Sequence, residues 1–260
     1  MMDLKDTLKK IGLLYSSEHL DDLVDLATQK RFGPHQLLEY LSELELRDCT
    51  RRSLERRMQH SKLGRFKPMA DFDWKWPDKI DREAVQNALS LGFLSQQRNL
   101  ILVASQGLGK TMIAKNIIYN AVMKGHSALF TTASDMLLNL SSQESSRMLD
   151  RRLKYYARMP CLCVDEIGYL SYDSRNADLL FQLVAMRYES KSLLITTNLS
   201  FKQWPTIFPG AACTTALIDR VVHHADIITI EGESYRLREA QNSKKKKTSK
   251  SEDSVSKSPS

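Results

Sequence analysis

A glycine-rich turn followed by lysine and threonine is the segment of this chain best suited to bind phosphate. Residues 99–117 read NLILVASQGLGKTMIAKNI, an apolar run that passes through the turn into a helical pattern. Backbone N–H groups at the start of a helix point toward an anion, and the helix dipole adds positive potential there. The spacing therefore predicts a phosphate-binding loop for ATP. The residues expected to bind the nucleotide are Gln106, Gly107, Leu108, Gly109, Lys110, Thr111 and Met112.

Within this loop the residue types predict separate tasks. Lys110 has the reach to contact the β- and γ-phosphates, and the Thr111 hydroxyl is a ligand for Mg²⁺. The pattern G-x-x-x-x-G-K-[ST] begins with glycine, but Ala104 stands at that position. Its methyl group matters only if the backbone there needs a positive φ. We expect the substitution to be tolerated, because the amide-donating stretch QGLGKT is intact.

Polar residues at the ends of two later apolar runs complete a hydrolytic pattern. Asp165 and Glu166 end the run in CLCVDEIGYL, and Asn198 ends LLITTN. Asp165 is expected to join Thr111 in the Mg²⁺ shell, while Glu166 polarises the attacking water and Asn198 orients it. An acid pair of this kind can also cap a helix, but the phosphate loop upstream favours hydrolysis.

The segments around these residues alternate between apolar runs and helical patterns. Repeated β–α units with apolar strands predict an α/β fold, a five-stranded parallel sheet covered by helices. Strands are expected over residues 99–104, 126–133, 161–166, 192–198 and 225–232. A helix is expected over residues 134–158, with Ser134 as its N-cap.

The β–α region is preceded by a segment with helical patterns and followed by a polar tail. Residues 1–64 are expected to form a small all-helical N-terminal domain, in which apolar stripes that include Val24 and Leu38 form the core. Residues 65–240 would form the ATPase domain, and residues 241–260 a disordered tail rich in lysine and serine. Aromatic residues around Phe72 and Trp76 are expected to fasten the linker to the ATPase domain rather than to stack on bases.

Positive charge is concentrated in two places. The chain carries a formal net charge of +7. Residues 51–67 hold seven basic residues against one acid, and residues 241–260 hold six lysines against two acids. This distribution favours a polyanionic partner, most simply DNA, although a solvated helix face and a solubilising tail are the alternatives. The candidate DNA-binding residues are Arg51, Arg52, Arg56 and Arg57.

Other features of the sequence bear on the cellular location and on whether the cysteines and histidines bind metal. The sequence has no apolar stretch of membrane-spanning length and no signal-peptide pattern, so we expect a cytosolic protein. Cys161 and Cys163 are expected to pack as small buried hydrophobic residues. The pair His223–His224 is not expected to bind metal, because adjacent histidines diverge on a helix and no carboxylate has suitable spacing.

The whole pattern resembles the IstB-like ATPases, transposition helpers encoded by insertion sequences, and their relatives the DnaC-type helicase loaders. The resemblance extends from about Asp6 to Glu239. It rests on LERRMQHSKLGRFKPMADFDW, GLGKT, FTTASDML, VDEIGYL, LLFQLVAMRYE, ITTNLSFKQW and LIDRVVHHADIITIEGESYRLRE, of which the last favours the IstB branch. Two departures, Ala104 and the methionine at position 112 where the family often has histidine, bear on hydrolysis rate more than on nucleotide binding.

The resemblance implies an AAA+ ATPase with an N-terminal helical domain that forms ATP-dependent oligomers on DNA and recruits or activates a transposase. It also implies that Arg220 acts as an arginine finger on a neighbouring subunit's γ-phosphate, and that Arg236 acts as a sensor within its own subunit. The alternatives are a helicase loader and a non-hydrolysing, DNA-binding scaffold that ATP only switches.

Overall fold

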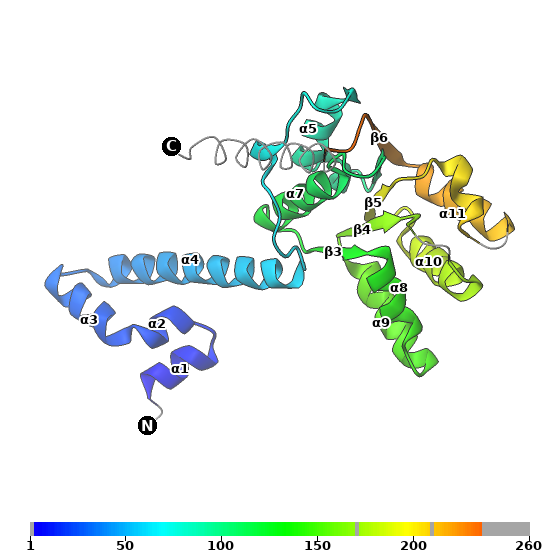
Figure 1. Ribbon diagram of the computed structural model, residues 1–260. Coiled ribbons are helices and arrows are strands. Elements are labelled where there is room, and N and C mark those ends of the chain that lie inside the picture. Colours follow the sequence, from blue (N-terminus) through cyan, green and yellow to red (C-terminus); the bar gives the residue numbers. More distant parts are fainter. Residues whose placement is uncertain (1–2, 170–171, 209–210, 236–260) are drawn as a thin grey trace, which may run out of the picture. The chain divides into compact units, whose positions relative to one another are not determined.

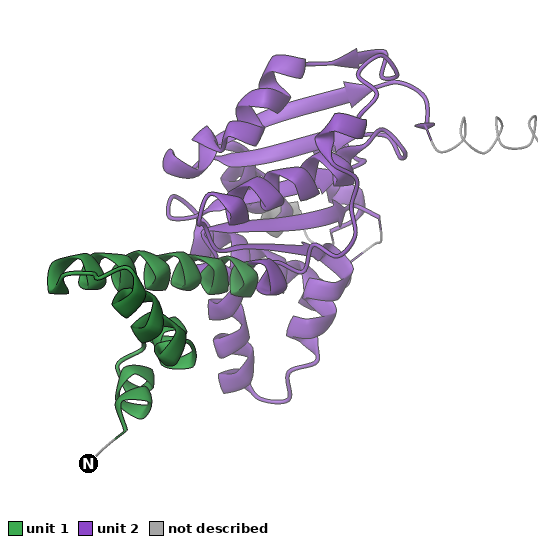
Figure 2. Ribbon diagram, turned by 90° about the vertical axis from the view of Figure 1, so that its left-hand side faces the viewer, with its two compact units in different colours: residues 1–57 green, residues 58–260 purple. Residues whose placement is uncertain are grey.

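A computed structural model describes residues 3–169, 172–208 and 211–235 of the chain. The chain divides into two compact units, Met1–Arg57 and Met58–Ser260, here called unit 1 and unit 2 (Figure 2). The domain boundaries expected after residues 64 and 240 stay a prediction, and residues 241–260 lie outside the described part. Among the described helices, none combines the length and the apolarity that a membrane span requires.

Unit 1 is helical, as the sequence predicts, but its apolar stripes do not all form a core. Its helices are α1 (Leu4–Lys10), α2 (Leu14–Glu18), α3 (Leu20–Gln29) and α4 (Pro34–His60), the last of which ends just inside unit 2 (Figure 1). Leu23 is buried, whereas Val24 and Leu38 are 53% and 65% exposed, so that part of the expectation is wrong. One long helix and three short ones offer too little surface to cover every apolar residue.

The sheet of unit 2 contains the five predicted parallel strands and one short strand more. Its order is β1-β6-β2-β5-β4-β3, with β1 antiparallel to β6 and the other neighbours parallel. The strand β1 was not predicted, because two residues are too few to show an alternating pattern. The strands are β1 (Lys79–Ile80), β2 (Asn99–Ala104), β3 (Ala128–Thr132), β4 (Cys161–Ile167), β5 (Ser192–Thr197) and β6 (Ala225–Glu231).

Helices cover both faces of this sheet (Figure 1). On one face α7 (Lys110–Met123) packs against β2, β3, β4 and β5, with α5 (Arg82–Ser90) beside it. The other face carries the main hydrophobic core, which α8 (Ala133–Ser141), α9 (Ser146–Arg158), α10 (Ser174–Arg187) and α11 (Ala211–Val222) supply. Three short helical turns, α6 (Gly92–Ser95), η1 (Met69–Asp71) and η2 (Phe201–Thr206), complete the unit.

The segment expected to be one helix is two, and the predicted N-cap is wrong. Thr132, the last residue of β3, accepts a hydrogen bond from the Asp135 amide at 3.1 Å, so α8 begins before Ser134. A second cap at Ser145 accepts from the Met148 amide at 3.3 Å and begins α9. Each capping hydroxyl satisfies an amide that lacks an intrahelical partner, which allows a helix to start directly after a strand or a short turn.

Cys161 and Cys163 lie inside the sheet and are fully buried. Burial raises the pKa of the Cys161 thiol to about 12, because the apolar surroundings disfavour a thiolate. Both residues therefore pack as small neutral side chains, as predicted.

A buried arginine joins the end of α9 to the start of β5. The Arg187 guanidinium donates to the carbonyls of Tyr156, Ala157, Met159 and Ser192. The first two of these carbonyls belong to the last turn of α9, where carbonyls lack the regular i→i+4 amide donor. Burial lowers the pKa of Arg187 to about 10. A cation at this helix end also interacts favourably with the helix dipole.

The aromatic linker packs within unit 2 against the phosphate loop and the segment after β6, which confirms the packing interpretation. The Phe72 and Trp74 rings meet edge to face at 4.8 Å, and the Arg82 guanidinium lies 5.0 Å from the Trp74 ring. Trp76 donates its indole N–H to the Glu233 carbonyl at 2.8 Å. The linker thus closes over the loop side of the ATPase unit.

Candidate nucleotide site

The predicted phosphate loop connects β2 to α7, with Gly109 as the N-cap of that helix. Gly107 and Gly109 have left-handed backbone, with φ of 79° and 89°. A Cβ on Gly107 would lie 2.1 Å from Ser234 Oγ, and a Cβ on Gly109 would lie 2.6 Å from Phe72 Cε2. Both positions therefore require glycine for their backbone conformation and for the space around them.

Ala104 ends the strand in ordinary extended conformation. It pairs with Ile230 in the register of β2 and β6 and is 4% exposed. Among the described residues, the non-glycine positions with left-handed φ do not include it. Alanine would strain the loop only at a positive φ, which Ala104 does not have. We therefore expect its methyl group to change ATP affinity little.

Two separate sets of hydrogen bonds hold the Lys110 ammonium and the Thr111 hydroxyl in place. Lys110 Nζ donates to the carbonyls of Ala104 at 2.6 Å and Ser105 at 2.8 Å, which holds the ammonium over the loop. Thr111 Oγ1 lies 3.0 Å from Asp165 Oδ2. A helix start and a strand end are thus linked through the two residues predicted to hold Mg²⁺.

The two acids at the end of β4 occupy different environments. Asp165 is buried, and its carboxylate accepts a hydrogen bond from the Thr196 hydroxyl in the neighbouring strand β5. Glu166 is exposed and has a left-handed φ of 65°, at a register irregularity between Val164 and Ile167. This conformation turns Glu166 toward the cavity while Asp165 stays beneath Thr111. A strained non-glycine residue of this kind is typical of functional sites.

Most of the predicted nucleotide-binding residues, together with Glu166 and Asn198, line one cavity of about 300 Å³, which is within the usual size range of ligand sites. Leu108 and Asp165 are both 2% exposed and lie behind the lining. Predicted residues that line the cavity are Gln106, Gly107, Gly109, Lys110, Thr111, Met112, Glu166 and Asn198, and unpredicted ones are Lys67, Tyr169 and Tyr235.

Of the site residues that sequence reasoning missed, Thr196 and Tyr235 have hydrogen bonds to predicted site residues. Thr196 links both acids, because its hydroxyl donates to Asp165 and accepts from the Glu166 amide at 2.9 Å. The signal was present, since Thr196 and Thr197 are polar residues inside an apolar strand. Tyr235 donates its amide to the Gly107 carbonyl at 3.1 Å, and no local pattern in the sequence indicates that contact.

Of the two arginines implied to act in hydrolysis, only Arg220 lies in the described part of the chain. Arg220 lies on α11, where its guanidinium is 4.8 Å from the ring centre of Phe181 on α10, and it does not line the cavity. Arg236 lies outside the described residues. The four candidate DNA-binding arginines lie in unit 1.

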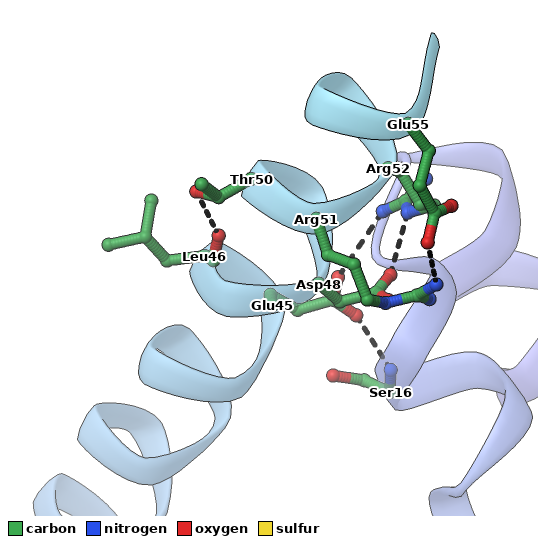
Figure 3. Close-up of polar contacts among 8 residues, drawn as sticks. All are labelled: Ser16, Glu45, Leu46, Asp48, Thr50, Arg51, Arg52 and Glu55. Carbon is green, nitrogen blue, oxygen red and sulfur yellow. Dashed lines mark hydrogen bonds and ion pairs between the residues drawn. The ribbon is translucent and has the colours of Figure 1, made fainter. Parts of the chain in front are cut away.

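Figure 3 shows two of those four arginines, Arg51 and Arg52, paired with acids of unit 1. Arg51 binds Asp48 at 2.5 Å, and Arg52 binds the same carboxylate at 2.6 Å. Glu45, 8% exposed, accepts from the Ser16 amide at 2.6 Å and so ties α4 to α2. The hydrogen bond from Arg51 lowers the pKa of Asp48 below its usual value. Arg51 and Arg52 thus balance acids that lie just before the basic segment at residues 51–67.

The loop between β2 and α7, facing acids at the end of a parallel strand, places the chain in the class of AAA+ P-loop ATPases, and as such it binds ATP. More specifically, it belongs to the IstB-like ATP binding protein family, whose model matches residues 6–243. A relative from Bacillus thuringiensis subsp. berliner, named for insertion sequence IS232 and ATP binding, is 36% identical over 91% of this chain and 94% of its own length. Another from Pseudomonas aeruginosa, named for insertion sequence IS21 and ATP binding, is 31% identical over 92% and 90%.

Solved structures show the same fold. The crystal structure of DnaI matches with a TM-score of 0.53 and 19% identity, over 66% of this chain and 92% of that one. The replication initiator DnaA bound to AMPPCP and single-stranded DNA matches with a TM-score of 0.50 and 16% identity, over 63% and 52%. At these identities the likeness concerns the fold alone.

Proposed function

We propose that this ATPase is a DNA-binding regulator that oligomerises on DNA in an ATP-dependent manner and recruits or activates a transposase. The observation that carries the proposal is the contact between Thr111 and Asp165, 3.0 Å apart, beside Glu166 at the mouth of the same cavity. This arrangement would give Mg²⁺ two oxygen ligands and give the attacking water a base. The insertion-sequence names of the relatives support a transposase as the client.

The residues present fit a magnesium ion bound with ATP. A threonine hydroxyl and a carboxylate are oxygen ligands, which Mg²⁺ prefers, and they converge from α7 and β4. When bound, Mg²⁺ would neutralise charge on the β- and γ-phosphate oxygens. Lys110 would exchange its carbonyl partners for the phosphates. Glu166 would hold the attacking water, with Asn198 to orient it.

A basic stripe on α9 supports DNA binding and was not predicted. Arg147, Arg151, Lys154 and Arg158 are exposed, and their spacing of four, three and four residues places them on one face of the helix. Of these four residues, only Lys154 forms an ion pair in the described structure. Its partner is Asp150 at 2.7 Å, and such an exposed pair is weak. The sequence contains the signal for this stripe, because basic residues three or four positions apart lie on one face of a helix.

The proposed function is tested by measuring the size of the full chain with ATP and double-stranded DNA, each alone and together. We expect large particles only when both are present, because ATP joins neighbouring subunits and DNA adds basic contacts from each of them. Sedimentation velocity distinguishes such particles from the free chain. A size that responds to neither ligand would contradict the proposal, and assembly with ATP that never hydrolyses would favour the switched scaffold.

Charge reversal on α9 is expected to weaken DNA binding in a salt-dependent way. Changing Arg147, Arg151 and Arg158 to glutamate should reduce the slope of log K against log salt by about 0.9 for each DNA phosphate that the protein no longer neutralises. Fluorescence anisotropy with a labelled duplex at several salt concentrations measures this slope.

Two further variants make that measurement specific. Reversal of Arg56 and Arg57 tests the segment in unit 1, while Arg51 and Arg52 stay in place because they balance Glu45 and Asp48. Arg175→Glu, an exposed arginine on α10, is the matched control and should leave the slope unchanged. A slope that no reversal alters would mean that the DNA path lies elsewhere.

A further inference from the structure

Two adjacent histidines and a distant glutamate form a compact cluster on the surface of unit 2. One ligand atom from each of Glu189, His223 and His224 lies within 4.8 Å of the others. His224 Nε2 is 3.6 Å from Glu189 Oε1, and the two imidazole rings are 4.0 Å apart between centroids. This is the one such group of potential metal ligands among the described residues.

The sequence argument against metal at these histidines does not hold. It assumed that His223 and His224 diverge on a helix, but α11 ends at Val222, so both lie in the turn before β6. It also found no suitably spaced carboxylate. The carboxylate comes instead from the turn after α10, and contact between α10 and α11 brings the two turns together.

The surroundings of the cluster favour a cation and orient its ligands. Helices α10 and α11 both end beside it, and the C-terminal end of a helix carries partial negative charge. The Tyr188 hydroxyl lies 2.6 Å from His223 Nδ1, so one ring nitrogen has a partner that orients the imidazole. Glu189 adopts a left-handed φ of 55°, an uncommon conformation for a non-glycine residue.

We propose that Glu189, His223 and His224 bind a divalent transition-metal ion such as Zn²⁺. Two imidazoles and one carboxylate are a common zinc ligand set, and three protein ligands leave a coordination position open. Bonds of about 2.1 Å in tetrahedral geometry place ligand atoms about 3.4 Å apart, near the observed separation of His224 and Glu189. The other ligand atoms, which lie within 4.8 Å of one another, would have to move closer together. Small side-chain rotations can achieve this, because all three residues are exposed.

A metal here would tie the end of α11 to the turn between α10 and β5. Helix α11 also carries Arg220, three residues before His223. The bound ion would therefore hold the helix from which the proposed arginine finger projects. Binding of the ion itself is independent of the nucleotide site and of the proposed function.

The test is zinc titration of the tag-free full chain by calorimetry, with Mg²⁺ present to occupy oxygen-ligand sites. Cys49→Ser is included in every protein, because Cys49 is an exposed thiol that could take the metal. We expect one Zn²⁺ per chain. His224→Ala and Glu189→Gln should each weaken binding at least ten-fold, and Co²⁺ should show a d–d absorption spectrum that is absent from both variants.

His35→Ala is the matched control, because His35 also pairs with a glutamate, Glu39 at 3.4 Å, but has no second histidine beside it. It should bind Zn²⁺ as the starting protein does. Zinc should also raise the melting temperature of the starting protein by about 5 °C at a hundred-fold excess over Kd, and of neither cluster variant. The starting protein here is the chain with Cys49→Ser alone. If it and both cluster variants bind zinc equally, or if His35→Ala loses as much affinity as they do, the proposed site is wrong. His224 and Glu189 would then be only a surface ion pair.

Discussion

Mixing Arg220→Ala with Lys110→Ala is expected to restore ATP hydrolysis that neither variant has alone. Lys110 lines the nucleotide cavity, whereas Arg220 lies on α11 and does not line it. If Arg220 completes the site, it does so on a neighbouring subunit. One variant then contributes an intact loop and the other an intact finger. Random mixing in equal amounts places the two in the productive order at about a quarter of the interfaces, so about a quarter of the full rate is expected.

The size of the single-variant effects follows from the chemistry. An arginine finger contributes about 10³–10⁵ in kcat by stabilising charge in the transition state, so Arg220→Ala should lose nearly all hydrolysis while it still binds ATP. Phosphate release at several mixing ratios measures the recovery. Each interface would join unlike surfaces, so repetition should give a ring or a helical filament rather than a closed dimer.

The matched control is a mixture of Arg220→Ala with the double variant Lys110→Ala, Arg220→Ala. It contains the same proportion of intact loops but no intact finger, and it should recover nothing. Absence of recovery at every ratio in the first mixture, together with normal assembly of Arg220→Ala alone, would rule out a finger that acts between subunits.

The Glu166→Gln variant is expected to bind ATP and to hydrolyse it about 10²–10⁴-fold more slowly. Glutamine keeps the size of the side chain and its hydrogen-bonding reach but cannot polarise water as a carboxylate does. The Glu166 amide would keep its bond to Thr196, so the backbone around Asp165 should not change. With hydrolysis blocked, the assembled state should persist on DNA.

Two comparisons make this result specific. Lys110→Ala should lose ATP binding itself, because it removes the charge that meets the phosphates. Glu231→Gln, an exposed glutamate on β6 outside the cavity, should behave as the unmodified chain. Binding is followed with a fluorescent ATP analogue and turnover by phosphate release. Hydrolysis by Glu166→Gln at the unmodified rate would show that another group activates the water.

Local chemistry explains why the phosphate loop and the strands were predictable. The left-handed backbone at positions 107 and 109 leaves room only for glycine, so the requirement is visible in the residue types. Strands buried on both faces are largely apolar, which marked β2, β3, β4 and β5, whereas β6 is partly exposed. The carboxyl ends of parallel strands share one edge, and the same reasoning therefore brought Asp165 and Asn198 to the loop.

Other features depend on pairs of residues far apart in the chain, and no local pattern encodes them. Thr196 joins Asp165 to Glu166 only because β5 lies between β2 and β4 in the sheet. The left-handed conformation of Glu166 arises from an irregularity in that pairing. Part of the positive charge of residues 51–67 is neutralised within unit 1, because Asp48 pairs with Arg51 and Arg52.

The residue types and their spacing were thus enough to establish the class of enzyme, the phosphate loop and the acids beside it, because each has a local requirement for backbone conformation or charge. The partners of those groups depended on the packing of separate elements. The turn after α10 meets the turn after α11, which gathers Glu189 with His223 and His224, and Arg220 on α11 is not among the residues that line its own subunit's cavity. Contacts between elements are set by how the whole core closes, and that information is spread over the chain rather than held in any one segment.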